Sequence, residues 1–174
     1  MHLRQPAVAG RFYTDVPADL RAEVESFLKQ GAALPASALA AGAAAHLAGL
    51  MLPHAGHVYS GRVIGATLAH VRLPRTVFLL CPNHTGLGTP LSVWPAGAWQ
   101  TPLGPVPVDG EMARLLCEAD EDFSADVMGH VREHSIEVLL PFLQVCAGDA
   151  PLHVVPVCVG TTCRGAWPAQ TWRK

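Results

Sequence analysis

The sequence predicts an α/β fold in which helices cover both faces of a mostly parallel sheet. Short buried apolar runs alternate with helical patterns along the chain, which is the arrangement that parallel sheets require. The chain has 174 residues, of which 50% are hydrophobic. A chain of this length buries roughly 70% of its unfolded surface, so we expect one domain with a real core.

The first predicted helix covers residues 16–30. Leu20, Val24 and Phe27 recur at helical spacing, Pro17 suits a first helical position, and Gly31 suits the end. The Ala-rich residues 32–45 read as a loose connection or a poor helix. The apolar run at residues 47–52 is then predicted to be a buried strand that ends at a proline.

A helix at residues 60–71 follows, with Val63, Ile64 and Leu68 on one side. Residues 76–80 form a β-branched and aromatic run, which predicts a second buried strand. Residues 90–94 are a candidate third strand.

Three elements complete the predicted order. Residues 109–118 read as a helix, with Asp109 as its N-cap. Residues 135–145 are apolar and helical in pattern, and Pro141 must kink that helix or mark its real start. Residues 153–159 read as another buried strand.

Charge and cysteine usage exclude several classes of protein. The net charge is −2 and the pI about 6.5, so a basic surface for nucleic acid is not expected. The five cysteines form no CxxC pair, which favours a reduced, cytoplasmic setting over a disulfide framework. Residues 30–61 carry no formal charge, but their alanines, glycines, prolines and histidines do not make a membrane span.

Two histidines follow predicted strands in the same pattern of proline, histidine and glycine. His54 follows the strand at 47–52, and His84 follows the strand at 76–80. Ligands of parallel sheets bind beyond the carboxyl ends of strands, and imidazole is a common ligand of zinc, copper and iron. The alternative is a pair of loop histidines that cap backbone groups. His57 is expected to face solvent or pack in the turn.

A second cluster is Glu133-His134-Ser135-Ile136-Glu137. A histidine flanked by carboxylates has a partner that fixes its tautomer, as a general base requires. The alternative is a helix start capped by Ser135, with solvated charges on either side.

Five blocks, in this order, resemble one known family. They are RQPAVAGRFY from Arg4, PHAGHVYSG from Pro53, CPNH from Cys81, TPLG from Thr101 and EHSIEVLLPFL from Glu133. Together they resemble the Memo-like family, whose microbial members are called AmmeMemoRadiSam system protein B. The likeness covers residues 4–160.

This resemblance implies a three-layer α/β/α fold around a mixed sheet, similar to class III extradiol dioxygenases. It implies iron or copper as the cofactor, with His54 and His84 as metal ligands. His134 is then the catalytic candidate, as an acid/base group or a substrate contact in the same cleft. Family members supply a cysteine as a further ligand, and they do so in a later segment.

The chain departs from the family pattern at its end. We expect residues 1–160 to form an incomplete Memo-like domain, and residues 161–174 to be an irregular, non-native tail. The third protein ligand would then be absent and the metal weakly held. One sheet edge would be unpaired, which favours marginal stability and self-association.

Two functions remain open at this stage. One is a metal-binding protein whose cleft takes a small molecule or a peptide, without nucleic-acid or membrane partners. The other is a non-haem iron dioxygenase that acts on an aromatic diol, for which this short chain would be inactive.

Overall fold

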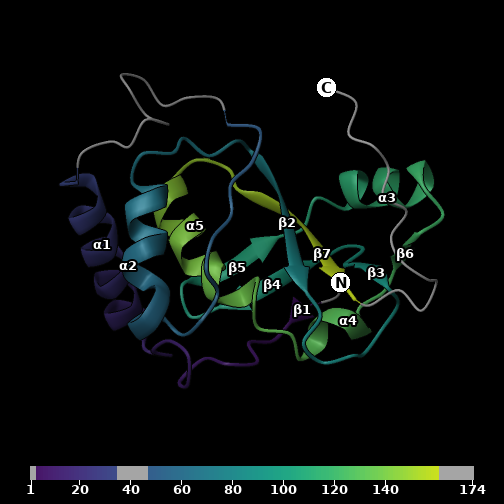
Figure 1. Ribbon diagram of the computed structural model, residues 1–174, viewed down its shortest axis with the longest axis horizontal. Helices are drawn as coiled ribbons and strands as arrows, with labels where there is room; N and C mark the ends of the chain where they lie inside the picture. The colour runs from purple at the N-terminus through teal and green to yellow at the C-terminus, as the bar shows by residue number, and fades with distance from the viewer. Residues whose placement is uncertain (1–2, 35–46, 161–174) are drawn as a thin grey trace.

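The computed structural model describes residues 3–34 and 47–160, which form a mixed α/β fold around two small sheets (Figure 1). The larger sheet has the strand order β2-β7-β3-β6. Its strands are β2 (Thr76–Pro82), β7 (His153–Val159), β3 (Leu91–Val93) and β6 (Phe123–Ala125). The β2–β7 and β3–β6 pairs are parallel, whereas β3 and β7 are antiparallel. The sheet is therefore mixed, as predicted.

The smaller sheet consists of β1 (Leu3–Arg4), β4 (Ala98–Thr101) and β5 (Gly104–Pro107), in the order β1-β4-β5. Its first strand is only two residues long, and it pairs in parallel with β4. This pairing fixes the N-terminal segment of the described chain next to a part of the sequence almost 100 residues away.

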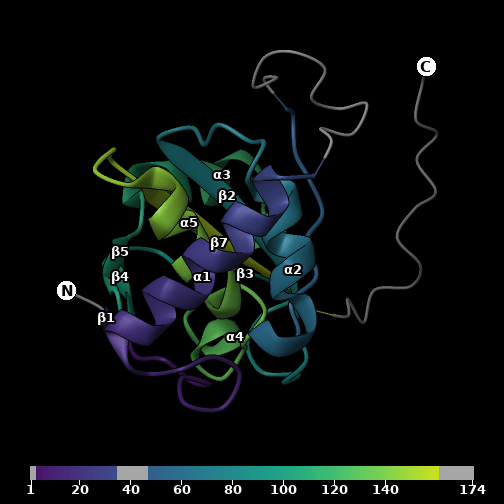
Figure 2. The same cartoon turned by 90° about the vertical axis from the view of Figure 1, so that its left-hand side faces the viewer.

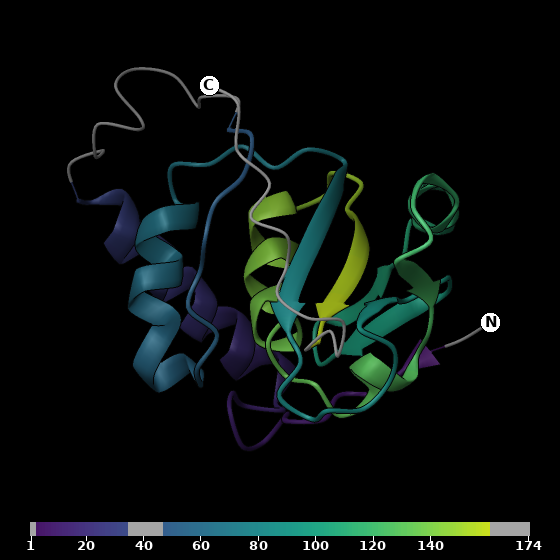
Figure 3. The same ribbon diagram turned by 45° about the vertical axis from the view of Figure 1, so that its right-hand side comes forward.

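Helices lie on both sides of the larger sheet. On one side are α1 (Pro17–Ala32), α2 (His57–Leu68) and α5 (Leu140–Ala147), and on the other is α3 (Gly110–Ala119) (Figure 3). The short helices α4 (Met128–Val131) and η1 (Glu137–Leu139) connect β6 to α5. The main core lies on the α5 side, and a smaller core lies beneath α3. The smaller one consists of Val93, Ala113, Val155 and Val157.

Close packing of α1 against α2 depends on glycines (Figure 2). A Cβ at Gly65 would meet the backbone of Phe27, and one at Gly31 would meet the backbone of Gly65. Neither helix could approach the other this closely with a larger residue at these positions.

The predicted helices are mostly confirmed. Asp109 caps α3, since its carboxylate accepts a hydrogen bond from the Met112 amide at 3.1 Å. Pro141 marks the true start of α5, and the residues before it form the separate turn η1. Several boundaries were wrong: α1 continues past Gly31 to Ala32, and α2 spans His57–Leu68 rather than residues 60–71. The helix predicted at residues 135–145 is α5, which spans only Leu140–Ala147.

The strand predicted at residues 47–52 was wrong. This segment has no strand hydrogen bonding and is largely exposed, with Met51 94% exposed. It runs between α2 and β2 (Figure 1) without joining the sheet, so β2 remains an edge strand among the described residues. Leu80 of β2 is consequently 70% exposed. An apolar run becomes a buried strand only where a sheet edge pairs with it and side chains cover it.

Two further predictions lie outside the described residues. They are the irregular tail at 161–174 and residues 35–45, which make up most of the Ala-rich connection. Of the helices that the structure describes, none combines the length and the hydropathy needed to cross a membrane.

Candidate metal centre

Three histidines from distant parts of the chain converge on one point. His54 precedes α2, His84 follows β2, and His134 precedes η1. Each offers a ring nitrogen, and the three ligand atoms lie within 4.8 Å of one another. The ring centroids are 5.3 Å apart for His54 and His84, 4.9 Å for His84 and His134, and 5.9 Å for His54 and His134. The structure therefore brings together all three histidines predicted for the site.

The loop that carries His54 is fixed by backbone contacts and not by a strand. The His57 amide donates to the carbonyl of Phe12 at 2.8 Å, and the Ser60 hydroxyl donates to the carbonyl of Ala55 at 2.7 Å. Gly56 lies against Phe12 so closely that an added Cβ would be 3.1 Å from the Phe12 carbonyl oxygen. The glycine of the motif therefore allows the N-terminal segment to hold the His54 loop.

His84 is positioned by the buried carboxylate of Glu133, whose side chain is 1% exposed. One oxygen, Oε2, accepts the His84 amide at 2.7 Å, and the other, Oε1, lies 3.0 Å from His84 Nδ1. Oε1 also accepts the His134 amide at 2.8 Å and the Ser135 hydroxyl at 2.7 Å. Burial raises the pKa of Glu133, but the hydrogen bonds from His84 and Ser135 outweigh it and lower the pKa to about 2.

This arrangement determines which histidine nitrogen is available. Because Glu133 accepts from Nδ1 of His84, Nε2 is the nitrogen left to bind a ligand, as in the carboxylate–histidine pairs of metal sites. Ser135 Oγ lies 3.4 Å from the same Nδ1 and itself donates to Glu133. A serine nucleophile needs its base on the other ring nitrogen, so these three residues do not form a hydrolase triad.

The His134 ring lies close to the rings of His54 and His84 and also contacts Phe12. Its Nδ1 is 3.3 Å from Glu133 Oε1, and its ring meets Phe12 edge-on at 4.9 Å between centroids. Burial lowers the pKa of His134 below its ordinary value, Glu133 opposes that shift, and the nearby His84 and His54 add to it. The neutral imidazole, which is the form that binds metals, is therefore favoured.

The second carboxylate of the motif, Glu137, has a structural role. It is fully buried, and it pairs with the buried guanidinium of Arg4 at 2.7 Å. It also accepts the amides of Ala7 and Val8 at 2.8 and 2.9 Å and the Tyr13 hydroxyl at 2.7 Å. The alternative of a capped helix start with solvated charges is therefore wrong, since both carboxylates are buried and Ser135 caps no helix.

His57 is also structural, and it packs in the turn rather than facing solvent. It is 1% exposed, its Nδ1 lies 3.0 Å from Glu23, and its Nε2 lies 2.9 Å from the carbonyl of Val138. With both nitrogens occupied, it has no position free for a ligand.

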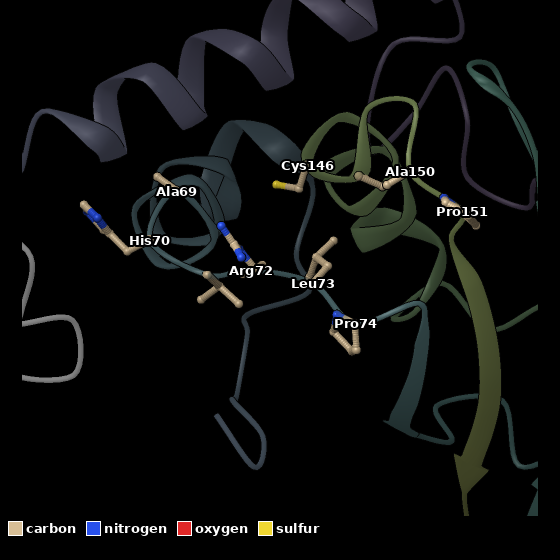
Figure 4. Close-up of a pocket in the computed structure, with 10 residues that line it drawn as sticks. Ala69, His70, Arg72, Leu73, Pro74, Cys146, Ala150 and Pro151 are labelled. Atoms are coloured by element: carbon tan, nitrogen blue, oxygen red, sulfur yellow. The ribbon is translucent and has the colours of Figure 1, made fainter. Parts of the chain in front are cut away.

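The histidine cluster opens onto a large apolar cavity of 1690 Å³. His54 and His134 line one part of it, and residues of β2, of α2 and of segments 47–52 and 71–74 line other parts. A smaller pocket of 490 Å³ lies by the carboxyl ends of α2 and α5, with Arg72 and Cys146 beside it (Figure 4). It is at the opposite end of β2 from His84, and none of the predicted site residues lines it.

Comparison with known proteins shows the family of this chain. The family model described as "Memo-like protein" matches residues 4–165. The chain belongs to the Memo-like family. A "MEMO1 family protein" of Desulfurococcus amylolyticus is 41% identical over 172 residues, which cover 92% of this chain and 58% of the relative. Another, from Thermotoga neapolitana, is 46% identical over 114 residues, or 64% of this chain and 40% of the relative.

The chain thus spans about half the length of the curated Memo-like relatives it matches. Its three imidazoles still form a donor set that suits a transition metal, because neutral imidazole binds zinc, copper and iron. Sequence reasoning found these histidines through their motifs. It assigned no role to Arg4 and Tyr13, the two ends of the first family block, because their contacts with Glu137 are visible only in the fold.

Proposed function

We propose that this Memo-like chain is a metal-binding protein that holds iron or copper through His54 and His84. The observation that carries the proposal is the convergence of three imidazole nitrogens within 4.8 Å, beside a buried carboxylate that orients one of them. Bound iron or copper would supply redox and Lewis-acid chemistry. The protein's own contribution is to hold the rings in place and to present an apolar cavity beside them.

His134 has two possible roles, and they differ in what its loss would do. As a third ligand it would complete a three-histidine site. As an acid/base group, it would exchange a proton with a molecule in the cavity and leave metal affinity unchanged. Its distance to the other two ligand atoms, within 4.8 Å, allows either role.

The decisive experiment measures metal per chain after purification without oxygen. We expect iron or copper in the natural chain and loss of it in the variant His54→Ala/His84→Ala. His70→Ala is the matched control, because His70 lies outside the cluster and its ring contacts the Gly31 carbonyl at 3.2 Å. Metal that persists in the double variant, or falls equally in the control, would refute the proposal. His134→Ala then separates a ligand, which loses the metal, from an acid/base group, which keeps it.

An extradiol-type dioxygenase is the second candidate, favoured by the apolar cavity on which His54 and His134 open. Such walls suit the ring of an aromatic diol, and a small molecule or a peptide end is the proposed occupant. The test is oxygen uptake with catechols and Fe(II) under air. A yellow ring-opened product would support this activity, while metal binding without any turnover would leave the first proposal standing alone.

The setting proposed for this function is the reducing cytoplasm. The four cysteines in the described part of the chain are all free, as that compartment maintains them.

A further inference from the structure

Two of these free cysteines lie opposite each other on neighbouring strands. Cys81 of β2 is the register partner of Cys158 of β7 in their parallel pairing. Residues in register project to the same face of a sheet, and both thiols belong to the same buried core, 4% and 0% exposed. The sequence separates these residues by 77 positions, so their spacing gave no sign of a pair.

The two thiols influence each other's pKa. A hydrogen bond with Cys81 lowers the pKa of Cys158, while the same bond, together with burial, raises the pKa of Cys81. A proton lost from the pair therefore leaves the charge on Cys158, which makes Cys158 the better nucleophile. Cys117 on α3 and Cys146 on α5 have no such neighbour among the described residues.

The backbone geometry permits a bond between the two sulfurs. Neighbouring strands lie about 4.8 Å apart, within the range of about 4.4–6.8 Å that Cα atoms of disulfides span. Opposite Cβ atoms, about 5 Å apart, would need to approach to about 4 Å. Cys81 is the next-to-last residue of β2, which is an edge strand of the sheet that the described residues form, so a small movement there disturbs little of that sheet.

A small oxidant also has a route to the pair. Cys81 lines the same 1690 Å³ cavity onto which His54 and His134 open. A molecule the size of hydrogen peroxide that enters this cavity reaches Cys81, and the nucleophilic Cys158 is the register partner directly beside it.

We propose that Cys81 and Cys158 form a reversible disulfide beneath the histidine cluster, with a hydroperoxide as the oxidant. The Cys158 sulfur attacks a peroxide oxygen, the O–O bond breaks, and a sulfenic acid and one water form. The Cys81 sulfur then attacks the sulfenic sulfur, the S–O bond breaks, and a second water leaves. Two thiols are oxidised and one hydrogen peroxide is reduced to two waters, and a dithiol reverses the bond by exchange.

The test treats the full, metal-free chain with hydrogen peroxide in the presence of a chelator. Free thiols are then alkylated in denaturant, and digested peptides are mapped by mass. The background carries Cys146→Ser and Cys163→Ser, because Cys146, Cys158 and Cys163 share one tryptic peptide, residues 133–164. We expect one cross-linked peptide pair, containing Cys81 and Cys158, that disappears on reduction.

Matched variants make the result specific. Cys117→Ser should leave the cross-link intact, whereas Cys81→Ser should stop the reaction at a sulfenic acid on Cys158, which dimedone traps. The same treatment in urea should give mixed pairings. The proposal would be overturned if both cysteines were fully alkylated after peroxide treatment. It would also be overturned if the folded chain gave the same mixed disulfide pairings as the chain in urea. Since no metal is present, this outcome is independent of the proposed metal function.

Discussion

Replacement of Glu137 by glutamine tests how the N-terminal segment is held to the rest of the domain. The carboxylate has four donors: Arg4 and the Ala7 amide on Oε2, and the Val8 amide and the Tyr13 hydroxyl on Oε1. Glutamine keeps the shape but replaces one oxygen with an NH₂ group, which cannot accept. The least costly orientation puts that group at Oε1, where the Tyr13 hydroxyl can reverse its role and accept.

The expected cost follows from what remains unpaired. In that orientation the Val8 amide loses its acceptor, and the Arg4 guanidinium, whose side chain is 1% exposed, loses its counter-charge. Breaking a buried ion pair by changing one partner typically costs about 3–5 kcal/mol. Because a domain of this size is stable by about 5–15 kcal/mol, the change removes a large share of the total.

The assay is equilibrium unfolding in urea at neutral pH, followed by far-UV circular dichroism. Arg4→Met is the companion variant, since it leaves Glu137 with three donors and no facing charge. The double variant should lose less than the sum of the single losses, with a coupling energy of about 1–3 kcal/mol. A loss below about 1 kcal/mol for Glu137→Gln would refute the reasoning, because it would mean that water or movement compensates the buried pair.

Three further predictions concern other parts of the chain. Burial lowers the pKa of His130 from its ordinary 6.5 to about 4. Between these two pH values the unfolded chain binds more protons than the folded chain, so the free energy of unfolding should fall by up to about 3 kcal/mol as the pH drops from 6.5 to about 4. In His130→Gln the urea midpoint should depend less on pH over this range. The same dependence of the midpoint on pH in the variant and the natural chain would contradict the prediction. Glu133→Gln should weaken metal affinity by about 10–100-fold in a Co(II) titration, because the partner of His84 Nδ1 is altered; equal affinity would show that it does not orient the ring. Gly65→Ala should cost about 1–3 kcal/mol or more by thermal melting, because its Cβ meets the backbone of α1. Its control is Gly49→Ala, where an added Cβ meets nothing within 4 Å, and equal losses in the two variants would rule out helix contact as the cause.

Sequence patterns predicted correctly those elements that are determined by interactions between residues close in the sequence. The capping residue Asp109 and the position of Pro141 both set helix starts through their own backbone, and both were found in the sequence. The apolar residues 47–52 show the opposite case. Their composition satisfies the requirements of a strand, but strand formation also depends on a pairing edge and a covering layer, which a local pattern does not contain.

The same limit applies to the site: the sequence pointed to its histidines but not to the roles of its carboxylates. Motif spacing pointed to His54, His84 and His134, and their meeting at one point follows from the fold. The roles of the two flanking carboxylates could not be assigned, because Glu133 and Glu137 differ only in what lies around them. One contacts the histidines, and the other contacts a segment more than 120 residues away.

The bonds between residues 4–13 and Glu137 have a consequence for synthesis of the protein. The Arg4 side chain finds its acceptors at residues 130, 133 and 137, and the loop with His54 rests on Phe12 beside them. Contacts of such large sequence separation form slowly, because a long loop must close before they contribute. During translation, the first segment of the chain must therefore wait until residue 137 has emerged before it can make these contacts, and the histidine cluster cannot form before His134 has emerged. A chaperone that shields the early apolar segments in that interval would raise the yield of folded protein without changing its final stability.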